Sequence, residues 1–180
     1  MIETQEAIDL ARALLGTPYA RMDCIGLIVR IIRTGKGGRT DYRTAGTNSL
    51  WRSYTMSAKY KDLTWRQEGT GGARPGMLAF KRRADDVHHV GLVTEAGTVI
   101  HTSSEKGCVV ETALDKSWSL LAIHRDIAVQ ESWEDGKQDE EACGEAMGMQ
   151  DDEQRVTIVD DEGSCFRPKG GWRVYFGSID

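Results

Sequence analysis

A cysteine and two histidines stand in an order that could support nucleophilic catalysis. Cys24 begins the apolar run CIGLIVRII, His89 lies in VHHVGLVT, and His101 lies in TVIHTSS, further along the chain. A nucleophile, a general base and a group that orients the base are the three parts that such catalysis requires. The sequence therefore predicts a Cys-His-His site, and the fold must bring three separate segments together.

The segment around Cys24 is expected to be a helix. Apolar residues recur at helical spacing from Leu27 to Ile31, Gly35 follows as a stop, and Asp23 is a good N-cap. A thiol in the first turn meets the positive end of the helix dipole and unpaired N–H groups, and both favour the thiolate form. Taken alone, such a cysteine is more often a small packing residue. The prediction that Cys24 is catalytic therefore depends on the two histidines.

The two histidines are expected on neighbouring strands. If 87–94 and 98–103 form a hairpin around the EAG turn, His101 can orient His89 through a ring-nitrogen hydrogen bond. On a strand, His89, Gly91 and Val93 share one face. The missing side chain of Gly91 leaves room for another element, such as a helix N-terminus, to approach the imidazole. A lone histidine in such a strand is more often a hydrogen-bonded structural residue.

The elements that must position these residues suggest an α+β domain over 1–128. A first helix is expected at 4–15, capped by Thr4, ended by Gly16, and with Leu14 and Leu15 on its apolar face. The stretch 36–74 is interpreted as irregular or partly helical, with its aromatic residues packing it onto the body. Strands are expected at 76–82, 87–94, 98–103, 107–113 and 119–127. Their short turns predict an antiparallel meander beneath N-terminal helices.

Composition narrows the classes of protein. The 180 residues are 39% hydrophobic and 28% charged, as in ordinary globular proteins. No stretch approaches the roughly 20 apolar residues of a membrane helix, so no membrane insertion is expected. The N-terminus lacks the features of a secretory signal, which predicts a protein that is cytoplasmic as synthesised and is released by lysis or carried in a virion. A phage or mobile-element origin rests on that absence alone, and an intracellular role in recycling wall peptides fits the same sequence.

Cysteine and aromatic patterns exclude further classes. The four cysteines show neither a CxxC pair nor a Cys/His spacing typical of zinc, so neither a metal nor a disulfide framework is expected. The aromatic residues among basic ones in 36–74 lack a recognisable RNA-binding motif, and no nucleic-acid partner is expected.

Charge divides the chain. Residues 1–130 carry 18 Lys and Arg against 14 Asp and Glu, whereas 131–163 carry 2 against 13. Such an acidic run cannot bury enough apolar surface to fold alone. We interpret 129–155 as an acidic linker or insertion and 156–180 as a short β-like C-terminal segment.

Three stretches, taken in order, resemble the NlpC family of cysteine peptidases, which are papain-like bacterial and phage hydrolases of the cell wall. They are LLGTPYARMDCIGLIVRII, RPGMLAF and VHHVGLVTEAGTVIHTSSEKGCVVETAL, within roughly residues 6–127. The resemblance implies a papain-like NlpC fold with N-terminal helices packed on a central antiparallel β-sheet. It implies Cys24 as nucleophile, His89 as base and His101 as orienter. It also implies Tyr19 and Asp23 on the substrate and oxyanion side, with the Cys24 backbone N–H as oxyanion donor.

The same resemblance implies a substrate and leaves alternatives. The family cuts peptidoglycan stem peptides between D-γ-glutamyl and a diamino acid, without a cofactor. A CHAP-like amidase that cuts the sugar-to-peptide amide is the close alternative. ARM before the Asp-Cys pair and Ile25 after it depart from the family pattern. They motivate a third reading, an inactive wall-binding or phage-tail module of the same fold, with Arg21 and Ile25 reshaping the site.

Overall fold

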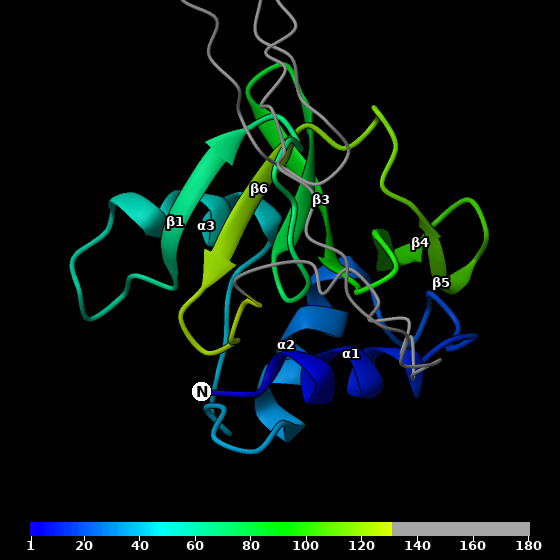
Figure 1. The fold of residues 1–180 in the computed structure, drawn as a ribbon, viewed down its shortest axis with the longest axis horizontal. Helices are drawn as coiled ribbons and strands as arrows, with labels where there is room; N and C mark the ends of the chain where they lie inside the picture. Colours follow the sequence, from blue (N-terminus) through cyan, green and yellow to red (C-terminus); the bar gives the residue numbers. More distant parts are fainter. Residues whose placement is uncertain (131–180) are drawn as a thin grey trace, which may run out of the picture. The chain divides into compact units, whose positions relative to one another are not determined.

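Three helices and a six-stranded sheet make up the part of the chain that the computed structural model describes, residues 1–130 (Figure 1). The helices are α1 (Thr4–Arg12), α2 (Cys24–Thr34) and α3 (Thr47–Arg52), followed by a short 3-10 helix, η1 (Ser53–Thr55). The strands are β1 (Leu63–Glu68), β2 (Leu78–Arg83), β3 (Asp86–Val93), β4 (Thr98–Ser103), β5 (Cys108–Ala113) and β6 (Leu120–His124). The predicted α+β class is confirmed. The segments predicted beyond residue 130 lie outside the described residues.

The strand order corrects part of the predicted topology. The antiparallel sheet has the order β1-β6-β2-β3-β4-β5. The meander holds for β2 to β5, but β6 crosses back to lie between β1 and β2, and β1 falls in a stretch expected to be irregular or partly helical. The sequence of β6, LLAIH, is apolar on both faces and is almost wholly buried, as a central strand requires. Strands that follow each other in sequence usually lie side by side in the sheet. Here the burial of β6 outweighs that tendency.

The two faces of the sheet carry separate apolar clusters. The main core lies between the sheet and helices α1 and α2, and includes Phe80, Val90, Leu92, Ile100 and Leu120 from the strands. A smaller cluster on the opposite face includes Ala79, Val93, Val99, Trp118 and Leu121. Because these residues alternate along each strand, His89 and His101 belong to the face of the smaller cluster, with Val93 and Val99.

Helix α2 agrees with its prediction, whereas α1 differs at both ends. Asp23 caps α2 by accepting a hydrogen bond from the Gly26 N–H at 2.7 Å. The N-cap of α1 is Glu3 and makes no side-chain cap bond, because Thr4 instead donates its hydroxyl to the Ala128 carbonyl, 2.8 Å away. Helix α1 ends at Arg12, before the expected stop, and Leu15 is 44% exposed rather than packed.

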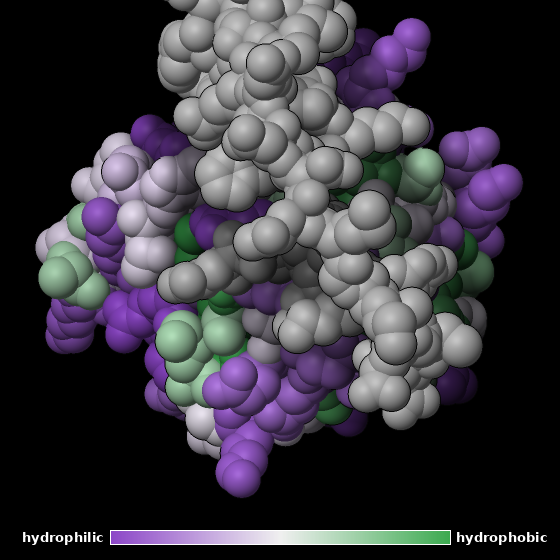
Figure 2. Space-filling view, viewed as in Figure 1, coloured by the Kyte–Doolittle hydropathy of each residue, from purple (hydrophilic) through white to green (hydrophobic). Residues whose placement is uncertain are grey.

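The connection from α2 to β2 is better ordered than the sequence suggested. Its aromatic residues do pack this stretch onto the body: the Trp51 ring meets Phe80 edge-on at 5.2 Å, and Arg66 lies over Trp51 and Tyr54. Tyr60 is the exception, since it is 57% exposed. Hydrophilic side chains stand out along the borders of the described part in Figure 2, with smaller apolar areas between them.

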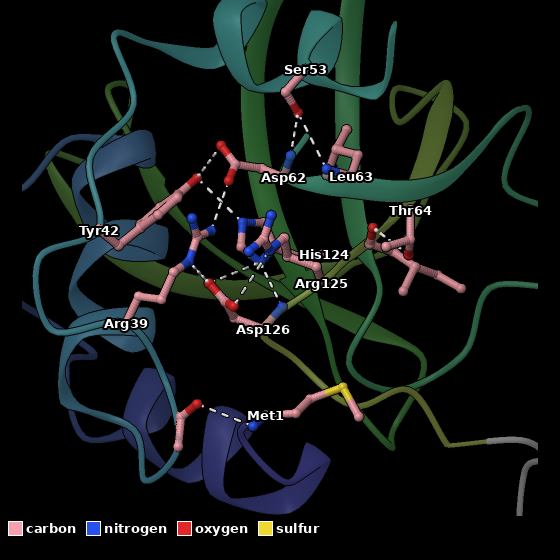
Figure 3. Close-up of polar contacts among 12 residues, drawn as sticks. Met1, Arg39, Tyr42, Ser53, Asp62, Leu63, Thr64, His124, Arg125 and Asp126 are labelled. Carbon is pink, nitrogen blue, oxygen red and sulfur yellow. Dashed lines mark hydrogen bonds and ion pairs between the residues drawn. The ribbon is translucent and has the colours of Figure 1, made fainter. Parts of the chain in front are cut away.

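A buried polar cluster joins the start of β1 to the end of β6 (Figure 3). Arg39 pairs with Asp62 and Asp126 at 2.7 and 2.6 Å. His124 accepts the Asp126 N–H on Nδ1, so its proton is on Nε2, which faces the Tyr42 hydroxyl at 3.2 Å. Within residues 1–130, no deeply buried side-chain nitrogen or oxygen lacks a partner. The cluster is therefore satisfied internally, as a structural network is.

No helix in the described part is both long and apolar enough to cross a membrane.

Candidate active site

The two candidate histidines meet across β3 and β4. The Nε2 atom of His89 lies 2.8 Å from Nδ1 of His101, and the rings are nearly perpendicular, at 88°. Backbone pairing between these strands covers only two residue pairs, Leu92 with Ile100 and Val93 with Val99. The imidazole contact therefore lies just beyond the paired part of the hairpin, and it links the two strands there.

Gly91 permits this contact, though not in the way the sequence suggested. The space beside it holds strand β4 rather than a helix N-terminus. A Cβ atom at Gly91 would lie 2.4 Å from Val99 Cγ1 and 2.9 Å from the Cβ of His101. Real Cβ atoms are almost never that close to another heavy atom, so any larger residue would push β4 away. The glycine sets the spacing between the strands that carry the histidines.

Two residues that the sequence analysis did not single out complete the surroundings of the pair. Trp118, only 2% exposed, packs its ring 5.5 Å from that of His89 and 5.2 Å from that of His101. Thr112 on β5 places its hydroxyl 3.1 Å from Nε2 of His101. Thr112 falls on the strand predicted at 107–113, next to the strand predicted at 98–103, so the sequence placed it near His101. Trp118 falls in the connection before the strand predicted at 119–127 and carried no such signal.

Burial and nearby charge keep both imidazoles neutral. Burial lowers the pKa of His89 to about 3, and the neighbouring His101, Lys81 and His88 add to that effect. Burial also lowers the pKa of His101 to about 4, with a further contribution from Lys81 and an opposing one from the Thr102 backbone. Lys81 lies over the Trp118 ring, with Nζ 4.6 Å from its centroid. At neutral pH both imidazoles are therefore unprotonated.

Cys24 opens the first turn of α2, as predicted, and belongs to the main core at 8% exposure. Its Sγ atom lies 3.8 Å from the Thr47 hydroxyl of α3. Among the described residues no hydrogen bond joins this thiol to His89. The start of α2 is nevertheless held against β4, because Thr102 donates to the Asp23 carbonyl at 3.2 Å. The helix N-terminus and the strand that carries His101 are thus fixed to each other.

The remaining predicted residues lie around this helix start. Tyr19 is 40% exposed, and its backbone N–H donates to the Gly107 carbonyl at 2.8 Å. The carboxylate of Asp23 caps α2 by accepting the Gly26 N–H. Ile25 is partly buried against the main core and Arg21 is exposed. Ile25, which departs from the family pattern, therefore packs against the main core.

Metal chemistry has no candidate centre in this region. Within the described residues, no group of three or more His, Cys, Asp or Glu side chains is arranged to hold a metal ion. Cys24 and Cys108 are both free thiols. The region offers a thiol at a helix N-terminus in the main core and a neutral, oriented imidazole on the opposite face of the sheet. Within the described residues no hydrogen bond brings the two together.

The solved structures that this chain resembles include one of a cell-wall hydrolase domain. It is the crystal structure of the NlpC/p60 domain of the peptidoglycan hydrolase SagA, with 17% sequence identity and a TM-score of 0.47. The alignment covers 66% of this chain and 97% of that domain. No protein-family model matches the sequence, and no curated protein matches it.

Proposed function

We propose that this protein is a cysteine endopeptidase that cuts peptidoglycan stem peptides between D-γ-glutamyl and a diamino acid. The observation that carries the proposal is the 2.8 Å contact between His89 Nε2 and His101 Nδ1, on two strands that also contact α2, the helix that begins at Cys24. An oriented imidazole and a helix-terminal thiol are two of the groups that acyl transfer to sulfur requires. The resemblance of the three sequence stretches to NlpC peptidases supplies the substrate class.

In the proposed reaction, His89 Nδ1 takes the thiol proton as Cys24 Sγ attacks the scissile carbonyl carbon. The contact with His101 occupies Nε2 of His89 and leaves Nδ1 for this transfer. His89 then gives the proton to the leaving amine, and water hydrolyses the resulting thioester with His89 again as base. No hydrogen bond joins Cys24 to His89 within the described residues, so the proposed reaction requires the thiol and the imidazole to come together when substrate binds.

The oxyanion would be stabilised by the N-terminus of α2. The Gly26 N–H is already used by the Asp23 carboxylate, so the N–H of Cys24 itself is the candidate donor. Tyr19, exposed on the loop before α2, is the candidate side-chain donor. One oxyanion donor is worth about 2.7 to 4 kcal/mol in the transition state. No metal or organic cofactor takes part in this proposal.

Purified protein incubated with a panel of defined muropeptides tests the proposal, with products analysed by mass spectrometry. We expect cleavage by the intact protein and none by Cys24→Ala. Cys108→Ala is the matched control, because it removes the other free thiol of the described part and should cleave normally. Absence of cleavage by the intact protein across several wall chemotypes would contradict the enzyme proposal.

One observation favours a second candidate, an inactive wall-binding module of the same fold. Cys24 is nearly buried and makes no hydrogen bond to His89 within the described residues. Such a module would sediment with purified sacculi without releasing any fragment. The CHAP-like amidase is distinguished by its products, since it would release whole stem peptides from the glycan instead of shortened ones.

The site of action is a separate proposal. Release by lysis, or carriage in a virion, would bring the protein to its wall substrate. Detection in virions or culture medium supports this route, whereas detection only inside cells supports a role in recycling wall peptides.

A further inference from the structure

A threonine on the next strand, β5, is hydrogen-bonded to the histidine pair. His101, only 6% exposed, uses Nδ1 toward His89 and Nε2 toward the Thr112 hydroxyl at 3.1 Å. Thr112 lies on β5, paired with Val99 of β4. Both ring nitrogens of His101 are thus engaged, and the chain of contacts runs from β3 through β4 to β5.

The number of hydrogens on each ring determines which group donates in the two hydrogen bonds, His89 with His101 and His101 with Thr112. Once His89 has taken a proton, both of its ring nitrogens carry hydrogen, so Nε2 donates and Nδ1 of His101 must accept. A neutral His101 then carries its single hydrogen on Nε2. That hydrogen points at the Thr112 oxygen, which must act as the acceptor.

We propose that Thr112 is a positioning residue of the reaction: its hydroxyl accepts the His101 N–H and so holds the tautomer that allows His89 to carry a proton. This inference rests on the proposed peptidase function. His101 takes the place that an acid occupies in many triads, and Thr112 is the group behind it, since no carboxylate among the described residues is hydrogen-bonded to His101. The bond is required only in the protonated state, which is the state formed during catalysis.

The other groups around the pair do not offer a substitute acceptor. The Trp118 ring packs edge-on against His101 and presents an N–H donor only. Lys81 on β2 and His88 on β3 are the charged or titratable groups that act on His89, and Lys81 also acts on His101. Glu111, beside Thr112 on β5, is engaged by Arg12 and Thr98.

Two variants separate this role from packing. Thr112→Val keeps the shape of the side chain and removes the acceptor, whereas Thr112→Ser restores it. On a muropeptide substrate we expect Thr112→Val to lower kcat about tenfold with little change in KM. Its acid limb in the pH profile should shift to lower pH, because the imidazolium of His89 is less stabilised. Thr112→Ser should retain most of the activity and the wild-type profile.

The role proposed for Thr112 can also be tested without substrate, by a measurement that does not depend on enzyme activity. Nitrogen-15 NMR of the ring nitrogens should show a protonated Nε2 on His101 in the wild-type protein and in Thr112→Ser, and loss of that preference in Thr112→Val. A Thr112→Val protein with wild-type kcat, or with unchanged His101 signals, would overturn the proposal and leave the peptidase function standing. If the wild-type protein cleaves nothing, the peptidase function fails, and the kinetic role of Thr112 with it.

Discussion

His89 and His101 lie within hydrogen-bonding distance, 2.8 Å between Nε2 and Nδ1, although the backbones of their strands are not paired at that level. The contact is made by side chains alone. It leaves Nδ1 of His89 as the nitrogen able to exchange a proton with the candidate nucleophile.

Substitution of His101 should therefore act through the orientation of His89. His101→Leu fills the site with an apolar side chain and removes the Nδ1 acceptor that faces His89. We expect activity on muropeptides to fall about 100-fold. His101→Asn places a carbonyl oxygen where an acceptor is needed and should retain more activity than the leucine variant. Equal activity of the two variants would contradict an orienting role.

Replacement of Gly91 should disturb the same contact from the backbone side. Gly91→Ala puts a Cβ against Val99, the Ile100 carbonyl and His101, and we expect a loss of about 1 to 3 kcal/mol in the free energy of unfolding. Gly71→Ala is the matched control, because nothing lies within 4 Å of its added Cβ. Denaturant unfolding measures both, and similar midpoints for the two variants would refute the close approach of β4.

The Arg39 cluster should affect stability and leave the chemistry unchanged. Arg39→Ala removes the partner of two largely buried carboxylates, and we expect a loss of about 3 kcal/mol, the lower end for such pairs because Arg39 is partly exposed. Arg82→Ala, which breaks a pair with the exposed Glu68, should leave the unfolding midpoint close to that of the wild type, because water screens an exposed pair. The kcat of folded Arg39→Ala should equal that of the wild type.

Stability should decline in mild acid because three buried histidines are held neutral. The pKa values of His89, His101 and His124 are lowered from 6.5 to about 3, 4 and 4. An unfolded chain binds these protons below about pH 6.5, whereas the folded chain resists them. Stability is thus fully present above pH 6.5 and is lost progressively as pH falls toward 4.

Thermal unfolding between pH 7.5 and 4.5 measures this dependence. His124→Gln removes one of the three buried imidazoles, from a position remote from the candidate site, and should flatten the slope. A variant slope as steep as that of the wild type would exclude His124 as a contributor.

Sequence reasoning reached the elements with strong local signals. Helix α2 was predictable because Asp23 caps it and its apolar residues recur at helical spacing, and the β3–β4 hairpin followed from a short turn between apolar runs. The register of that hairpin brought His101 near His89. These features are local, so a pattern of a few residues is enough to determine them.

The features that sequence reasoning missed depend on distant contacts. Thr4 does not cap α1 because its hydroxyl finds the Ala128 carbonyl, more than a hundred residues away. Strand β1 contains Trp65 and Arg66 between polar residues, and it exists because β6 pairs with it. Trp118 became part of the site only because the connection from β5 to β6 folds over the histidines.

The position of β6 also has a consequence for how the chain folds during synthesis. Strands β1 and β2 are made first but remain open-edged until Leu120 to His124 has emerged between them. The chain then closes over its own beginning, since Ile2 accepts the Ala128 N–H and forms a parallel bridge with Ile127. A nascent chain halted before residue 120 would expose two sheet edges and aggregate, so the sheet closes only after β6 has been made.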